Sequence, residues 1–250
     1  MDATVHSTVL AIAFAVIAVL YASVGQAGGT GYIAAIALAG LGPDVIKPTA
    51  LSLNILVATI AVARFAHAGY LTWRTCYPFA VLGVPFSALG GATNLPASVY
   101  HPVVGALLLI AAWQVFRSAE AAARHDGNSP ASPPFLSALA AGALTGFVSG
   151  VTGVGGGIFL APVILAFGWA GPRQTAAVSA VFNLMNSAAA LAATYATISA
   201  LPAELPWWLL AVGCGGAVGS WLGLRHFPET WLRYILSALL LVAGLRMLLA

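Results

Sequence analysis

Two glycine-rich stretches contain the residues of this sequence that are best placed to do chemistry. Residues 23–31 read SVGQAGGTG and residues 149–157 read SGVTGVGGG, so the two copies align at a constant offset of 126 residues. Glycine adopts backbone conformations that other residues avoid, and it lets other groups approach the main chain closely. In a bilayer, such non-helical backbone is tolerated only where it packs in protein or lines a cavity. Paired helix breaks at matching places therefore indicate a transport site.

The chemistry that these breaks would support is anion binding. A helix that begins at a break presents free main-chain N–H groups and the positive end of its dipole, which bind anions without a basic side chain. We expect the N–H groups of Gly28, Gly29, Gly155 and Gly156 to donate to an oxyanion, with side-chain donors around them. The full set of candidate binding residues is Gln26, Gly28, Gly29, Thr30, Ser52, Asn54, Ser149, Thr152, Gly155, Gly156, Ser179, Asn183 and Asn186.

Each of these residue types also has a structural interpretation. Glycine in membrane helices often serves close packing, which is how we interpret Gly215, Gly219 and Gly223, spaced by four with no short segment after them. A serine or threonine in a membrane helix commonly bonds back to its own backbone. For Asn54, Asn183 and Asn186, a binding site and interhelical hydrogen bonding are equally open interpretations.

Other titratable residues suggest no catalytic or metal site. Arg64 and His67, near the end of the third apolar segment, are interpreted either as interfacial anchors or as a first contact for anions arriving from the cytoplasm. Cys76 and Cys214 are interpreted as small buried hydrophobic residues, because they have no CxxC spacing. We find no HExxH motif and no intramembrane carboxylate pair. The sequence therefore predicts no enzyme activity, no metal and no cofactor.

The elements that position these residues must be membrane helices. Apolar residues make up 61% of the 250 residues, charged residues only 6%, and the mean hydropathy is +0.97. A soluble domain carries about 25% charged residues, so lipid must surround most of this chain. The nine basic residues lie scattered between apolar runs. They are interpreted as topology signals, and they form no cluster that could follow nucleic-acid phosphates.

Apolar segments of helical length divide into two similar halves. A hydrophilic linker at 118–134 separates a first membrane repeat (1–117) from a second (135–250), and residues 103–116 align with 235–248. The segments after the glycine motifs are short: 28–41 would reach only about 21 Å as a helix. Tryptophan and tyrosine near segment ends (Trp207, Trp208, Trp231, Tyr195 and Tyr234) are interpreted as interfacial belt residues. The predicted segments are 7–26, 28–41, 46–67, 75–94, 98–117, 135–152, 154–170, 174–197, 205–224 and 228–249.

The distribution of basic residues predicts the orientation of the halves. If all ten segments cross, Arg64, Arg74, Arg117, Arg173 and three further arginines share one side, and only Lys47 and Arg246 lie on the other. If the two short segments instead dip in and return, the basic residues split five against four. Cytoplasmic loops collect basic residues, so the linker is expected in the cytoplasm and both termini outside the plasma (inner) membrane. Five crossings in each half would make the halves an inverted repeat. The fold class is thus an all-α integral membrane protein with two inverted repeats and short broken helices after the glycine motifs.

The sequence also resembles a known family. The doubled glycine motif, the short apolar run after it (GVGGGIFLAPVIL, 153–165) and the Thr/Ser-rich helix that follows resemble the TauE/SafE family over nearly the whole chain. In the first copy, Gln26, Ala27 and Thr30 stand where that family often has glycine. The resemblance implies a transporter, with export of sulfur-containing anions such as sulfite or organosulfonates. An uptake permease or channel for another small solute, including a neutral sulfur compound, is the alternative. The expected partners are the anion and the bilayer, with a homodimer left open.

Overall fold

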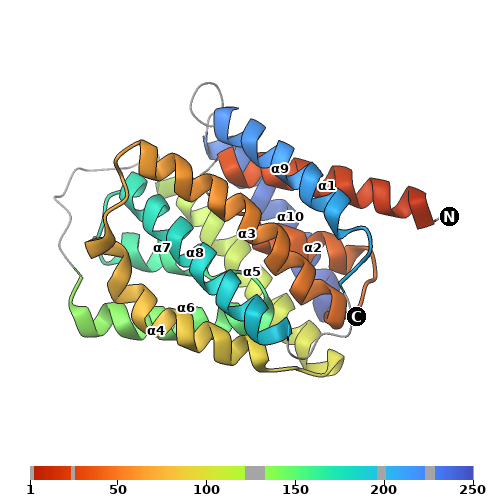
Figure 1. Ribbon diagram of the computed structural model, residues 1–250, viewed down its shortest axis with the longest axis horizontal. Helices are drawn as coiled ribbons and strands as arrows, with labels where there is room; N and C mark the ends of the chain where they lie inside the picture. Colours follow the sequence, from red (N-terminus) through yellow and green to blue (C-terminus); the bar gives the residue numbers. More distant parts are fainter. Residues whose placement is uncertain (1–2, 24–25, 122–132, 196–200, 223–228, 250) are drawn as a thin grey trace.

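The protein is an all-helical bundle in the computed structural model, which describes residues 3–23, 26–121, 133–195, 201–222 and 229–249 (Figure 1). No strand occurs in these ranges. The helices lie where the apolar segments predict them, with ends that differ by a few residues. They are α1 (Ala3–Ser23), α2 (Gly29–Leu38), α3 (Pro43–His67), α4 (Trp73–Ala92), α5 (Ala97–Ala121), α6 (Phe135–Thr152), α7 (Gly157–Ala166), α8 (Pro172–Tyr195), α9 (Leu205–Leu222) and α10 (Glu229–Leu249).

Helix length separates spanning helices from short ones. Six helices of the described ranges (α3, α4, α5, α6, α8 and α9) are long and apolar enough to cross a membrane. In contrast, α2 and α7 have 10 residues each. A helix of that length rises about 15 Å, half of a hydrocarbon core of about 30 Å. The short segments predicted at 28–41 and 154–170 therefore contain helices about half as long as the core is thick, which does not fit the expectation that each crosses as one helix.

The first short helix runs antiparallel to the helix before it. The Tyr21 hydroxyl bonds the Thr30 hydroxyl at 2.7 Å, and the rings of Phe14 and Tyr32 meet edge to face with centroids 5.8 Å apart. Later residues of α2 thus contact earlier residues of α1. The chain enters along α1, turns at the first glycine motif and returns along α2.

Helices from the two halves interleave. The first helix of each half packs on the fourth helix of the other: α6 lies against α4 along one edge of the bundle, and α1 lies against α9 along the opposite edge (Figure 1). The third helices, α3 and α8, pack on each other in the centre, and the fifth helices, α5 and α10, pack on each other at one flank. Contacts between halves therefore dominate the bundle.

Glycine makes the two edge pairs possible. A Cβ at Gly142, Gly146 or Gly150 would overlap a backbone carbonyl of α4. On the other edge, Gly215 and Gly219 stand in the same way against the carbonyls of Ala15 and Val19. The packing interpretation of Gly215 and Gly219 is confirmed, while Gly223 lies outside the described residues. Small residues let membrane helices approach this closely, which gains dispersion contacts.

We expect alanine at Gly146 to weaken the α4–α6 pair. The added methyl would overlap the Gly83 carbonyl oxygen, and overpacking of this kind costs about 1–3 kcal/mol. Thermal unfolding of the purified protein in detergent would measure the loss. The matched control is Gly213→Ala, because a Cβ there meets only a Leu56 methyl at an ordinary 3.4 Å. Equal unfolding temperatures for the two variants would show that glycine at position 146 is not needed for the packing of α4 on α6.

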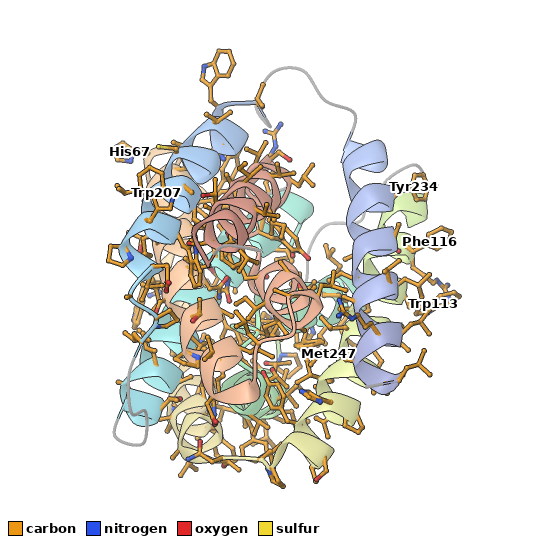
Figure 2. All side chains as sticks on the ribbon, turned by 90° about the vertical axis from the view of Figure 1, so that its right-hand side faces the viewer. His67, Trp113, Phe116, Trp207, Tyr234 and Met247 are labelled. Carbon is orange, nitrogen blue, oxygen red and sulfur yellow. The ribbon has the colours of Figure 1, made fainter. Side chains whose placement is uncertain are left out.

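Large aromatic side chains lie exposed on the outer surface, and one residue predicted for an interfacial belt is buried instead. Trp113 and Trp207 are both 60% exposed, and Figure 2 shows them pointing away from the bundle. The belt interpretation of Trp208 is wrong, because this side chain is 3% exposed and packs edge to face on Phe14 with centroids 5.4 Å apart. Its indole N–H lies 3.3 Å from the Ser7 carbonyl oxygen, so Trp208 joins α9 to α1. The side chains of Trp231 and Tyr195 lie outside the described parts.

The predicted linker between the halves is mostly outside the described residues. Helix α5 continues to Ala121, into the first part of the predicted linker, and α6 begins at Phe135 as predicted. Residues 122–132 of the predicted linker are not described.

Candidate functional site

Both glycine motifs interrupt the helices, as predicted. Gly28 (φ 90°) precedes the first residue of α2, and Gly156 (φ 84°) precedes the first residue of α7. Gly153 (φ 84°) ends α6, where its N–H donates to the Ser149 carbonyl at 2.8 Å. Gly155 has φ 91°. Only glycine adopts this left-handed conformation without strain, so these positions explain why both breaks are rich in glycine.

The two breaks meet inside the protein. A Cβ on Gly29 would overlap the Val154 carbonyl oxygen, so the start of α2 lies directly against the second break. The first residues of α2 and of α7 line one cavity of about 20 Å³, room for little more than a water molecule. Its lining consists of Tyr21, Gln26, Ala27, Gly28, Gly29, Thr30, Val154, Gly157, Ile158, Ser179, Ala180 and Asn183.

Two helix N-termini therefore converge on one cavity. The first N–H groups of a helix have no partner within that helix, and the helix dipole adds about half a positive charge at this end. No Asp, Glu, Lys, Arg or His belongs to the cavity lining. The arrangement can stabilise a small anion through main-chain N–H groups, and it offers neither a nucleophile with a base nor a set of metal ligands.

Hydroxyl groups at the cavity have hydrogen-bonding capacity left over. The Ser179 Oγ lies in the lining, on a side chain that is 4% exposed, and it has no hydrogen-bond partner among the described atoms. The Ser149 Oγ, beside Gly156, is likewise buried without a partner. Thr30 and Tyr21 bond each other, so one of the two hydroxyl hydrogens stays free. A buried polar group without a partner is costly, which favours a bound ligand at this place.

An amide pair joins the two central helices beside the cavity. Asn54 of α3 donates from Nδ2 to the Asn183 Oδ1 at 2.9 Å and to the Ser187 Oγ at 2.8 Å. Asn183 of α8 donates from Nδ2 to the Asn54 Oδ1 at 3.3 Å. Asn183 also lines the cavity, and one of its two N–H hydrogens is left over. Asn54 thus fits the interpretation as an interhelical hydrogen-bonding residue. Asn183 makes the same interhelical bonds and also lines the cavity.

The predicted site residues fall into three groups. Six lie in the cavity lining: Gln26, Gly28, Gly29, Thr30, Ser179 and Asn183. Four lie behind that lining, in or against the second break: Asn54, Ser149, Gly155 and Gly156. The other three do not line the cavity: Ser52 and Thr152 bond back to the carbonyls of Pro48 and Val148, the Thr152 hydroxyl also accepts the Val154 N–H of the second break at 3.4 Å, and Asn186 is buried with no hydrogen-bond partner for its side chain among the described atoms.

Two tyrosines at the site were not predicted. Tyr21 lines the cavity, and the ring of Tyr32 lies against Gly28, with its buried hydroxyl unpartnered in the described structure. The sequence offered one signal for these two residues, a tyrosine within an apolar run. A buried tyrosine hydroxyl usually finds a hydrogen-bond partner, so such a tyrosine indicates polar surroundings.

Basic side chains lie at helix C-termini and not in the cavity. Lys47 is only 5% exposed, and its ammonium donates to the carbonyls of Gly90, Gly91 and Thr93 at 3.2, 2.7 and 3.0 Å, where α4 ends. Arg246 donates to the carbonyl of Leu38 at the end of α2. Lys47, which the sequence indicates only as a topology signal, thus also makes hydrogen bonds inside the bundle. Each cation offsets the negative end of a helix dipole.

The predicted cytoplasmic contact residues do not form one site. Arg64 is half-buried and reaches the Ala22 carbonyl at 3.5 Å, near the end of α1, so it lies close to the first break. His67 is exposed at the end of α3, where its Nδ1 lies 2.7 Å from the Ala63 carbonyl oxygen. Neither side chain lines the cavity. The anchor interpretation fits His67, whereas Arg64 offsets the negative end of α1.

These features define a class of protein: a multi-pass helical membrane protein whose broken helices line a cavity between two halves, which is the architecture of a membrane transporter. Residues 9–247 match the family described as Sulfite exporter TauE/SafE, so the chain belongs to that family. A protein of Sinorhizobium fredii described as probable membrane transporter protein y4hK is 55% identical over 239 residues, which cover 96% of this chain and 97% of that protein. No solved structure matches the chain. The chain is a membrane transporter of this family and not an enzyme.

Proposed function

We propose that this transporter exports small sulfur-containing anions, such as sulfite or organosulfonates, through the cavity between α2 and α7. The observation that carries the proposal is the separation of charge within the bundle. Two helix N-termini face the cavity, while Lys47 and Arg246 occupy the negative ends of α4 and α2. The starts of α2 and α7 thereby supply positive potential at the cavity. The family description supports sulfite as one member of the substrate class.

The mechanism that we propose is alternating access by two inverted halves, 1–117 and 135–250. Packing of each first helix on the fourth helix of the other half, with the third and fifth helices paired, supports a two-fold relation between the halves. A cavity of about 20 Å³ is too tight for a sulfur oxyanion with its ligands. Substrate would therefore bind when the halves separate on one side, and this structure would correspond to a closed state.

The driving force that we propose is the membrane potential. Positive arginines at the ends of α3 and α5 support a cytoplasmic linker and external termini. No carboxylate is buried among the described residues, and proton or sodium coupling usually depends on one. A monovalent anion leaving a negative interior gains about 2.3 kcal/mol per 100 mV. We expect export to continue when the proton gradient is collapsed while the potential is held, and its arrest would count against this driving force.

The test of the proposed function is flux by purified protein in sealed liposomes. The panel is sulfite, methanesulfonate, thiosulfate, sulfate and a neutral thiol, with protein-free liposomes as the blank. We expect saturable, protein-dependent movement of at least one sulfur oxyanion. Movement of the thiol alone, or a rate that never saturates with anion concentration, would favour a permease or channel for another solute.

Removal of the Ser179 hydroxyl should weaken substrate binding with little effect on the fold. Its Oγ is buried, unpartnered in the described structure and part of the cavity lining, so alanine removes a donor without breaking an existing bond. A hydrogen bond to a charged group contributes about 1.5–3 kcal/mol, which corresponds to an increase in KM of roughly 10- to 150-fold. The control is Ser52→Ala, since Ser52 bonds only the Pro48 carbonyl of its own helix. Similar KM values for both variants would show that the Ser179 hydroxyl does not bind the substrate.

A further inference from the structure

The cavity that would hold the anion contains no full positive charge. Its twelve lining residues include no Lys, Arg or His. The positive potential there comes from the starts of α2 (Gly29) and α7 (Gly157), each equivalent to about half an elementary charge. The neutral donors that accompany them, the Ser179 hydroxyl and the free hydrogen of the Asn183 amide, add dipoles and no net charge. These two helix starts therefore offer at most about one positive charge in total.

The basic side chains near the cavity cannot add to this charge without breaking existing contacts. The Lys47 ammonium donates to three main-chain carbonyls at the C-terminal end of α4. The Arg64 guanidinium lies 3.5 Å from the Ala22 carbonyl oxygen at the end of α1. Both cations are already balanced by the negative ends of helices.

The fixed charge of the site limits the charge of its ligand. The cost of removing an ion from water grows with the square of its charge, so a dianion pays about four times the cost of a monoanion of the same size. Its attraction to fixed helix dipoles grows only in proportion to the charge. From this difference we infer that the cavity selects oxyanions with a single negative charge, such as a sulfonate or bisulfite, over dianions such as sulfate. This inference rests on the proposed function and names its substrate class more narrowly.

Methanesulfonate and sulfate form a suitable pair of probes, because both are tetrahedral and of similar size but differ by one charge. Each would compete with radiolabelled sulfite for flux into liposomes that contain the full-length protein. We expect methanesulfonate to inhibit at a concentration at least about tenfold lower than sulfate. Sulfate that inhibits as well as methanesulfonate, or methanesulfonate that does not inhibit, would overturn the inference and leave the sulfite transporter in place. Absence of any sulfite flux would instead overturn the proposed function, and this inference with it.

A change of charge in the cavity tests the cause of the selectivity. Gln26 lines the cavity and is half-buried, so Gln26→Lys would add a positive charge there, and Gln26→Met is the neutral control of similar length. We expect the lysine variant to narrow the preference for methanesulfonate over sulfate by about tenfold, and the methionine variant to keep the original ratio. The ratio of the inhibitory concentrations of sulfate and methanesulfonate does not depend on how much of each variant folds. A ratio that is the same in both variants would contradict the electrostatic cause.

Discussion

Replacement of Gly155 by alanine is expected to abolish anion flux. Gly155 has φ 91°, a conformation that costs a residue with a Cβ about 1–2 kcal/mol. The added methyl would also overlap the Asn183 Oδ1 and the Asn54 Nδ2, so the amide pair that joins α3 to α8 must separate. Since Asn183 lines the cavity, the start of α7 and its partners would no longer face the anion together. We expect flux in liposomes to fall by roughly 100-fold or more, because the groups that bind the anion would be displaced from one another.

The control for this variant is a glycine without these constraints. Gly171 follows the turn after α7 in the chain, it has no positive φ, and a Cβ there would meet nothing within 4 Å. Gly171→Ala should transport at the wild-type rate. Size-exclusion profiles of both variants would show whether the Gly155→Ala protein is folded. A folded Gly155→Ala protein with normal flux would remove the second break from the transport mechanism.

Asn183→Asp is expected to have the second large effect, because it changes charge at constant shape. The carboxylate would face the cavity where the anion is proposed to bind. Two like charges about 4 Å apart repel by about 4 kcal/mol at the effective dielectric of a protein, so we expect flux to fall by on the order of 1000-fold. The measurement is the initial rate of anion flux at several substrate concentrations.

A neutral change at the same position separates charge from packing. Asn183→Ser keeps a hydroxyl donor and also loses the bonds to Asn54. We expect the anion flux of the serine variant to fall roughly tenfold, which corresponds to the loss of one or two hydrogen bonds. If the serine and aspartate variants are equally impaired, the role of Asn183 is to join the helices, and the charge of the site is not the cause.

The positions of the helices were predictable because the bilayer constrains them. Apolar runs bounded by Gly and Pro mark membrane helices, and the glycine motifs at 23–31 and 149–157 contain the breaks that the structure shows. The repeat also indicated which segments would be short. These features depend on local sequence and on lipid as the solvent, both of which a single sequence reveals.

The contacts between halves were not predictable, because they depend on how helices cross. The pairing of Asn54 with Asn183 joins residues 129 positions apart. Lys47, a single lysine at the start of an apolar segment, gave no sign that it would be buried against the end of α4. Ser52 and Ser179 occupy similar places in the two repeats, yet only Ser179 lines the cavity. For Asn54 and Lys47, the hydrogen-bond partner comes from a helix far away in the sequence.

The most direct measurement is amide NMR of the purified, glycine-labelled protein during titration with sulfite or methanesulfonate, whichever anion the flux assay accepts. We expect saturable shifts of the amide signals of Gly29 and Gly157, the first residues of α2 and α7, which line the cavity. Gly40 and Gly171, where a Cβ would meet nothing within 4 Å, should stay unchanged. Unperturbed Gly29 and Gly157 amides at anion concentrations that saturate flux would show that the helix N-termini do not bind the substrate.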